Sequence, residues 1–279
     1  MSKGKNNSRE QFVTPDLSFT PKGLYIGGKW LESVKGKRFE SINPANMEIL
    51  GDVPLADEHD VNRAVLAAKE AFIDWKRMPI KERAGYLDAL ADKLQENRDE
   101  LGLIDCLDSG NTIAGMKGDV DWSADTWRYF VGLISEIKGE TFSEKPGHLN
   151  FTRRERYGVV AKINPFNHPL RFCAEKSASA LAAGNTVVMK ASEQAPLSSL
   201  RFAEICHEVL PPGVVNVLNG GITCGQAMVR HPDVRRVGVV GSVSTGKSIA
   251  KDAAEDLTHV TLELGGKNPV IIFPDVDPK

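Results

Sequence analysis

The sequence has no long apolar run, no block of like charge and few cysteines. No segment reaches the about 18 apolar residues that span a membrane, and residues 1–20 lack the apolar run of a signal peptide. Its 35 basic and 37 acidic residues nearly cancel and are interspersed. We therefore expect no membrane or nucleic-acid partner, a cytoplasmic location, and a small molecule as ligand.

The four cysteines show neither a C-x-x-C pair nor a Cys/His spacing typical of metal ligands. This gives little support to a disulfide framework or a metal site, so we expect no metal. Cys173 and Cys206 lie in helix-like runs with apolar neighbours and are interpreted as small core residues.

The sequence contains a helix-rich first half, followed by a second half in which strand-like and helix-like segments alternate. After a polar tail over residues 1–20, expected to be flexible, residues 21–138 begin with a hairpin pattern at 23–31. Helical periodicity then predicts helices near 61–75, capped by Asp57, and over 80–101 and 119–137. In the last of these, Trp122 and Trp127 are predicted to be buried.

Residues 139–157 are irregular and charged, with alternating apolar side chains, and predict an exposed arm that serves as an interaction edge. From 158 to 279, strand-like and helix-like segments alternate. This alternation predicts an α/β fold with a parallel sheet and helices on both faces. Such a sheet binds its ligands at the carboxyl ends of the strands.

Residues 241–248 match the P-loop pattern G-x-x-x-x-G-K-[ST] letter for letter. A strand before them and a helix after them are the context that a P-loop needs. An NTPase also needs a strand that ends in an Asp for magnesium. The segment most similar to such a strand is 270–275, and Pro274 interrupts it. A P-loop NTPase is therefore kept only as a remote alternative.

Several separated segments agree on one family. In order and at familiar spacing they resemble the NAD(P)-dependent aldehyde dehydrogenase superfamily: Lys162-Ile-Asn-Pro-Phe-Asn-His-Pro-Leu170, Gly184-Asn-Thr-Val-Val-Met-Lys-Ala-Ser-Glu-Gln-Ala-Pro-Leu197, Pro211-Pro-Gly-Val-Val-Asn-Val217, Gly241-Ser-Val-Ser-Thr-Gly246 and Leu262-Glu-Leu-Gly-Gly-Lys-Asn-Pro269. The resemblance implies that 158–279 form a Rossmann-like NAD-binding part. It also implies an aldehyde substrate that is oxidised to a carboxylic acid, and a homo-oligomer to which the arm at 139–157 contributes.

The resemblance implies a phosphate turn made by Gly241, Ser242, Thr245 and Gly246, whose small residues let a helix N-terminus approach the pyrophosphate. Lys190 and Glu193 would hold the ribose hydroxyls. Because a carboxylate repels a 2′-phosphate, Glu193 favours NAD over NADP. The further cofactor-binding residues that the resemblance implies are Ile163, Phe166, Gly225 and Leu264.

Two residues carry catalytic roles by resemblance. Asn167 would donate a hydrogen bond to the developing oxyanion, although an Asn before a helix can also be its N-cap. Glu263 would stand in open space after its strand and act as the general base that activates water. Phe166 and His168 replace the family's usual Trp and Phe, which leaves the shape of the substrate tunnel open.

The family's reaction also needs a cysteine thiolate, which attacks the aldehyde, and hydride transfer then leaves a thioester for hydrolysis. That cysteine normally lies a few dozen residues beyond the Glu-Leu-Gly-Gly segment, whereas 16 residues follow Glu263 here. We therefore expect a chain without the catalytic domain that is inactive alone. The alternative from another class is a non-catalytic, dinucleotide-binding fragment.

Overall fold

The computed structural model describes residue 15 and residues 17–277. Most of the polar tail predicted for residues 1–20 lies outside these residues. Within the described part of that stretch, Phe19 is buried in the core.

A seven-stranded sheet forms the centre of the molecule, in the order β11-β10-β7-β8-β9-β1-β2. The first five are parallel, and β1 pairs antiparallel with both β9 and β2. Their bounds are β1 (Leu24–Ile26), β2 (Lys29–Leu31), β7 (Val159–Ile163), β8 (Thr186–Ala191), β9 (Val215–Asn219), β10 (Val234–Gly241) and β11 (His259–Leu264). The predicted parallel sheet is confirmed, and the predicted hairpin at 23–31 extends it.

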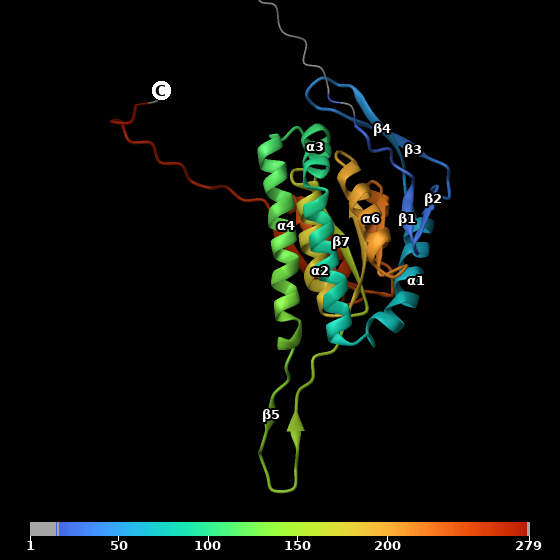
Figure 1. The fold of residues 1–279 in the computed structure, drawn as a ribbon. Coiled ribbons are helices and arrows are strands. Elements are labelled where there is room, and N and C mark those ends of the chain that lie inside the picture. Colours follow the sequence, from blue (N-terminus) through green and yellow to red (C-terminus); the bar gives the residue numbers. More distant parts are fainter. Residues whose placement is uncertain (1–14, 16, 278–279) are drawn as a thin grey trace, which may run out of the picture.

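Eight α-helices surround the sheet within the described residues. Their bounds are α1 (Glu58–Trp75), α2 (Ile80–Glu96), α3 (Arg98–Ser109), α4 (Ile113–Leu133), α5 (Pro169–Ala182), α6 (Leu197–Val209), α7 (Ile222–Val229) and α8 (Val243–Ala254). Figure 1 shows α2, α3, α4 and α6 covering one face of the sheet, with α1 on the other side.

Successive residues of the strands pack into two separate hydrophobic cores, one on each face of the sheet. Val159 and Ala161 of β7 pack with residues of α1, α7 and α8, whereas Val160 between them packs with residues of α2 to α6. Successive side chains of a strand point to opposite faces, so these apolar strands bury both sides. The prediction of helices on both faces is therefore confirmed.

Two expectations for the helix-rich half need correction. The helix predicted over 80–101 breaks at Asn97, whose side chain donates to the carbonyl of Lys93 at 2.8 Å and so competes with the helical hydrogen bonds. Trp122 was predicted to be buried, but it is 55% exposed, while Trp127 is fully buried. Five residues rotate a helix position by about 140°, so these two cannot share a face.

Two small hairpins stand apart from the main sheet. The first pairs β3 (Arg38–Ile42) with β4 (Ile49–Pro54), and the second pairs β5 (Thr141–Phe142) with β6 (Asn150–Phe151). The second hairpin projects away from the helices and exposes Phe142, Leu149 and Phe151 (Figure 1). It is the exposed arm that the sequence predicts. Its part in a homo-oligomer stays a prediction.

Two buried carboxylates of α3 fix the starts of α5 and α6. Asp105 Oδ2 accepts from the backbone N–H of Leu170 at 3.2 Å, and Asp108 Oδ2 accepts from that of Leu197 at 2.8 Å. The Ser41 hydroxyl also donates to Asp108. Carboxyl oxygens at helix N-termini satisfy free N–H groups, and when ionised they interact favourably with the helix dipole. Helix α5 is thereby anchored directly after the loop that carries Asn167.

These carboxylates give stability an unusual pH dependence. Burial raises the pKa of both Asp105 and Asp108 from 3.8 to about 7. Between about pH 4 and pH 7 these two groups then bind more protons in the folded state than in the unfolded state, so their contribution to the free energy of unfolding falls as the pH rises. We expect Asp108→Asn to flatten this fall, as measured by urea unfolding from pH 4.5 to 7.5. If the free energy of unfolding changed equally with pH in Asp108→Asn and in the unmodified chain, Asp108 would not be a source of the pH dependence.

Candidate functional site

Four neighbouring strands end at one edge of the sheet, and predicted cofactor residues stand on each of them. The strand register pairs Ile163 of β7 with Lys190 of β8, and Gly241 of β10 with Leu264 of β11. Strands β7 and β10 are themselves neighbours. The structure therefore brings together residues that are up to about 100 positions apart in the sequence.

Lys190 lies at the floor of this edge, under the first turn of α7. A Cβ placed on Gly225 would stand 3.7 Å from the Lys190 side chain and 3.8 Å from that of Ile163. Lys190 is only 6% exposed, and its Nζ donates to the Ala191 carbonyl at 3.0 Å and to Glu193 Oε2 at 3.1 Å. The half-exposed Glu193 carboxylate is thus held at the rim, where it can accept further hydrogen bonds.

The N-terminus of α8 forms the other half of this edge. Ser242 is its N-cap, with Oγ accepting from the backbone N–H of Thr245 at 3.1 Å. Gly246 lets the helix lie against β11, because a Cβ there would stand 2.6 Å from the Leu264 side chain. A helix N-terminus of this kind attracts anions through its free N–H groups and its dipole.

The same geometry argues against the P-loop alternative. Helix α8 begins at Val243, so Lys247 lies in its second turn and is exposed. A P-loop wraps phosphates with a loop between its first glycine and its lysine. That stretch is helical here, and no phosphate-wrapping loop forms.

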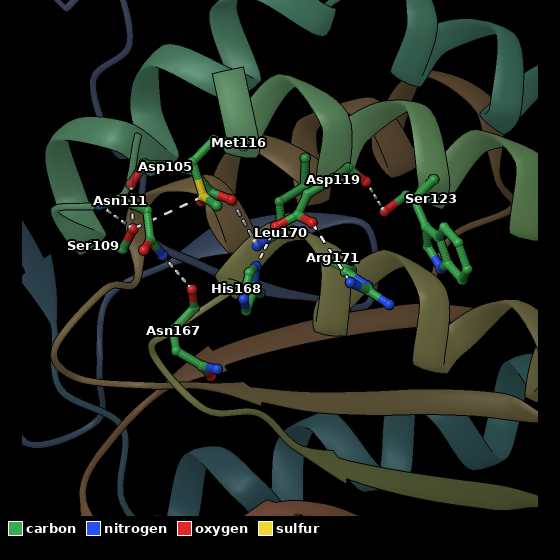
Figure 2. Close-up of polar contacts among 12 residues, drawn as sticks. Asp105, Ser109, Asn111, Met116, Asp119, Ser123, Asn167, His168, Leu170 and Arg171 are labelled. Atoms are coloured by element: carbon green, nitrogen blue, oxygen red, sulfur yellow. Dashed lines mark hydrogen bonds and ion pairs between the residues drawn. The ribbon is translucent and has the colours of Figure 1, made fainter. Parts of the chain in front are cut away.

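Asn167 lies in the loop between β7 and α5. Its backbone carbonyl accepts from Asn111 Nδ2, which anchors the loop to the segment between α3 and α4. Its side-chain amide is exposed, has no hydrogen bond among the described residues, and points away from α4 (Figure 2). The preceding Phe166 is half exposed. The amide is thus available to a molecule from outside.

The alternative interpretation of Asn167 as the helix N-cap is wrong. The N-cap of α5 is His168, and its side chain makes no capping hydrogen bond. The N–H group of Leu170 that a cap would satisfy donates to Asp105 of α3 instead.

A row of charged side chains runs along α5 from the Asn167 loop, as Figure 2 shows in part. His168 Nδ1 lies 2.5 Å from Asp119 Oδ2, and Arg171 lies 3.7 Å from the same carboxylate. Arg171 in turn donates to Glu175 at 2.9 Å and stacks on the ring of Trp122 at 4.8 Å. The sequence interpretation missed these residues, which come together only through the packing of α4 on α5.

Glu263 ends this row and departs from its prediction. Its Oε1 lies 2.6 Å from Lys176 Nζ, so the carboxylate is paired and not in open space. Burial acts against the Lys176 ammonium, but its contacts with Glu263 and Glu175 outweigh that effect and raise its pKa. Glu263 is still half exposed, and it points to the sheet face opposite Leu264, since successive strand residues alternate.

All four cysteines are free thiols, and three of them are buried. Burial raises the pKa of both Cys173 and Cys224 to about 12 and that of Cys206 well above its usual value. Thiols in this state are inert because the thiolate is the nucleophile. The interpretation of Cys173 and Cys206 as core residues is confirmed.

One acidic group in the described part of the chain has the spacing of metal ligands, namely Asp57, Glu58 and His59. Asp57 caps α1, and Lys35 Nζ lies 2.8 Å from Asp57 and 3.0 Å from Glu58. These carboxylates are thus already engaged by a helix cap and by a lysine, which gives the group a structural role. Among the described helices, none has the length and apolarity to cross a membrane.

Comparison with known proteins agrees with this geometry. The model of the aldehyde dehydrogenase family matches residues 30–279. Aldehyde dehydrogenase tropH of Talaromyces stipitatus is 44% identical, over 91% of this chain and 50% of its own length. Cytosolic 10-formyltetrahydrofolate dehydrogenase of Xenopus tropicalis is 42% identical, over 92% of this chain and 30% of its own.

Solved structures show the same relationship. An aldehyde dehydrogenase from Bacillus cereus in complex with NAD+ superposes with a TM-score of 0.88 at 40% identity, covering 94% of this chain and 54% of that one. This chain thus spans about half the length of such relatives or less. It belongs to the aldehyde dehydrogenase family.

Proposed function

We propose that this chain forms the NAD-binding part of an enzyme that oxidises an aldehyde to a carboxylic acid. The observation that carries the proposal is the meeting of Ile163, Lys190, Gly241 and Leu264 at one sheet edge, beside the N-terminus of α8. Parallel sheets bind dinucleotides at this edge. The family membership and the NAD+ complex of the Bacillus cereus relative support it.

The residues present fit a dinucleotide. The first turn of α8, from Ser242 to Gly246, would face the pyrophosphate, and the Lys190–Glu193 pair would hold the ribose hydroxyls. When bound, NAD supplies the hydride acceptor. The cofactor-lining residues that we propose besides these are Ile163, Phe166, Gly225, Gly241, Thr245 and Leu264.

Asn167 and Glu263 are proposed as the catalytic residues of this chain. The free amide of Asn167 would donate to the aldehyde oxygen as negative charge develops on it. Glu263 would take a proton from the attacking water. Because Lys176 now holds its carboxylate, that step requires Glu263 to exchange this partner for water.

The 279 residues themselves are proposed to bind dinucleotide without oxidising aldehydes. This proposal is supported by the cysteines: three of the four thiols are buried, and burial raises their pKa values, so they are poor nucleophiles. Purified chain incubated with NAD and a panel of aldehydes should show no increase in absorbance from NADH. Turnover that is lost on mutation of one of the four cysteines would contradict this proposal.

A homo-oligomer assembled through the arm at 139–157 and a cytoplasmic location also stay predictions. Sedimentation of the chain with and without the arm tests the first, and fractionation of cells tests the second. A monomer in both forms would overturn the role of the arm.

Choice between NAD and NADP should depend on Glu193. Its carboxylate would lie beside the 2′ position of the ribose and repel a phosphate there. We expect Glu193→Gln to improve NADP binding relative to NAD by about tenfold, as measured by calorimetry of both cofactors. Glu70→Gln, on the exposed side of α1, is the matched control and should change neither affinity. An unchanged ratio in Glu193→Gln would remove Glu193 from this role.

A further inference from the structure

A cavity of about 390 Å³ lies on the other face of the sheet, between helices α4 and α5 and strands β7, β10 and β11. This volume is within the range of small-molecule sites. Successive side chains of β7 point to opposite faces of the sheet. Ile163 faces Gly225 on the dinucleotide side, whereas the preceding Lys162 lines the cavity on the other side. A ligand here would therefore not occupy the dinucleotide position.

Lys162 is a charged residue in the otherwise apolar strand β7. In the described part of the chain its ammonium has no hydrogen-bond or ion-pair partner, and burial, with Arg236 and Lys176 nearby, lowers its pKa to about 8. Gly238 makes room for it, because a Cβ there would stand 3.0 Å from Lys162 Nζ. The fold thus keeps a cation without a direct partner at the cavity wall, where the nearby Glu263 carboxylate only partly offsets the effects that lower its pKa.

Asn164, two residues on, lines the same cavity. It is 6% exposed, and its Nδ2 has no hydrogen-bond partner among the residues that the structure describes. A buried amide without a partner costs stability, so an acceptor in the cavity would relieve it.

Arg236 supplies a third donor group. Its guanidinium donates to the hydroxyls of Tyr157 and Thr261 and lies 5.2 Å from the Tyr157 ring centre, but no carboxylate among the described residues pairs with it. The carboxylates of the cavity wall, Glu175 and Glu263, both contact Lys176, at 3.3 and 2.6 Å. The cavity wall thus carries three cations, Lys162, Lys176 and Arg236, against these two carboxylates, which leaves an excess of positive charge.

We propose that this cavity binds the carboxylate group of a small organic anion, with Lys162, Asn164 and Arg236 as its donors. A carboxylate suits the site better than phosphate, because a guanidinium and an ammonium match its two oxygens. Glu175 and Glu263 on the same wall repel a second negative charge. The site lies on the opposite sheet face from the dinucleotide edge, and it shares one wall residue, Glu263, with the catalytic residues of the proposed function.

The test is a titration of the 279-residue chain with sodium acetate and, in a separate arm, with inorganic phosphate, followed by ¹H–¹⁵N NMR. Acetate should shift the signals of Lys162, Asn164 and Arg236 to saturation. Lys162→Met should weaken acetate binding about tenfold or more. Lys251→Met removes an exposed lysine of α8 and should not change it. NAD affinity, measured in parallel, should be the same in all three proteins.

A second readout uses the unmodified chain. Acetate affinity should fall between pH 7 and pH 9.5 as Lys162 loses its proton, because its pKa is about 8 while contacts with Glu263 and Glu175 raise that of Lys176. Tighter binding of phosphate than of acetate would overturn the carboxylate assignment. Acetate shifts that do not saturate, or that are equal in Lys162→Met with wild-type thermal stability, would overturn the site.

Discussion

Replacement of Lys190 by Met is expected to weaken NAD binding to this chain by roughly 10- to 100-fold. Met is shorter by one atom but keeps the apolar stem that packs against Gly225 and Ile163. It removes the ammonium that holds Glu193 at the rim and that would donate to the ribose. Charged hydrogen bonds contribute more than neutral ones, so we expect this loss to be the largest at the edge. Calorimetric titration with NAD measures it.

The matched control is Lys247→Met on the exposed side of α8. A dinucleotide site needs no lysine there, so NAD affinity should stay within about twofold of wild type. The P-loop alternative demands the reverse, because its lysine reaches the phosphates. Loss of binding in Lys247→Met together with unchanged binding in Lys190→Met would contradict our assignment of the edge.

The second large effect concerns stability. Arg83 is 1% exposed, and its guanidinium donates to the carbonyls of Ala182, Trp75 and Met78 at 3.2 to 3.4 Å. It thus joins the carboxyl ends of α1 and α5. We expect Arg83→Met to lower the free energy of unfolding by about 3 kcal/mol, because buried carbonyls lose their donors. Such a loss is a large part of the total stability of a domain.

Urea unfolding of both proteins measures this difference. Arg128→Met is the control, because Arg128 is an exposed arginine of α4 that pairs with Asp92 at 2.9 Å. Exposed ion pairs contribute at most about 1 kcal/mol, so this variant should unfold nearly as the wild type does. Equal losses in the two variants would show that Arg83 does not join the helices.

Local sequence signals predicted most of the fold. Helix α1 begins where Asp57 predicts, because its side chain accepts from the N–H of His59 at 2.8 Å and completes a capping box. Helix α5 begins at Pro169, and Gly184 follows its end with a positive φ of 81°. Such signals depend only on neighbouring residues, and they are therefore readable without the structure.

Contacts between distant segments could not be predicted in the same way. Lys176 and Glu263 lie 87 positions apart in the sequence, so no local signal near Glu263 indicates that its carboxylate is paired. Asp119 reaches His168 only because α4 packs on α5. The charge of Lys162 within the run Val-Val-Ala-Lys-Ile is visible in the sequence, but the cavity beside it forms only through the packing of α4 and α5 against the sheet.

Binding of NAD at the sheet edge is tested most directly by a titration of the ¹⁵N-labelled chain with NAD. Saturable NMR shifts are expected at the amides of Lys190, Gly225, Gly241 and Gly246, with little change at Lys162 on the opposite face. An absence of saturable shifts, or shifts centred on the cavity between α4 and α5, would contradict the proposal that this chain holds NAD at the carboxyl ends of its strands.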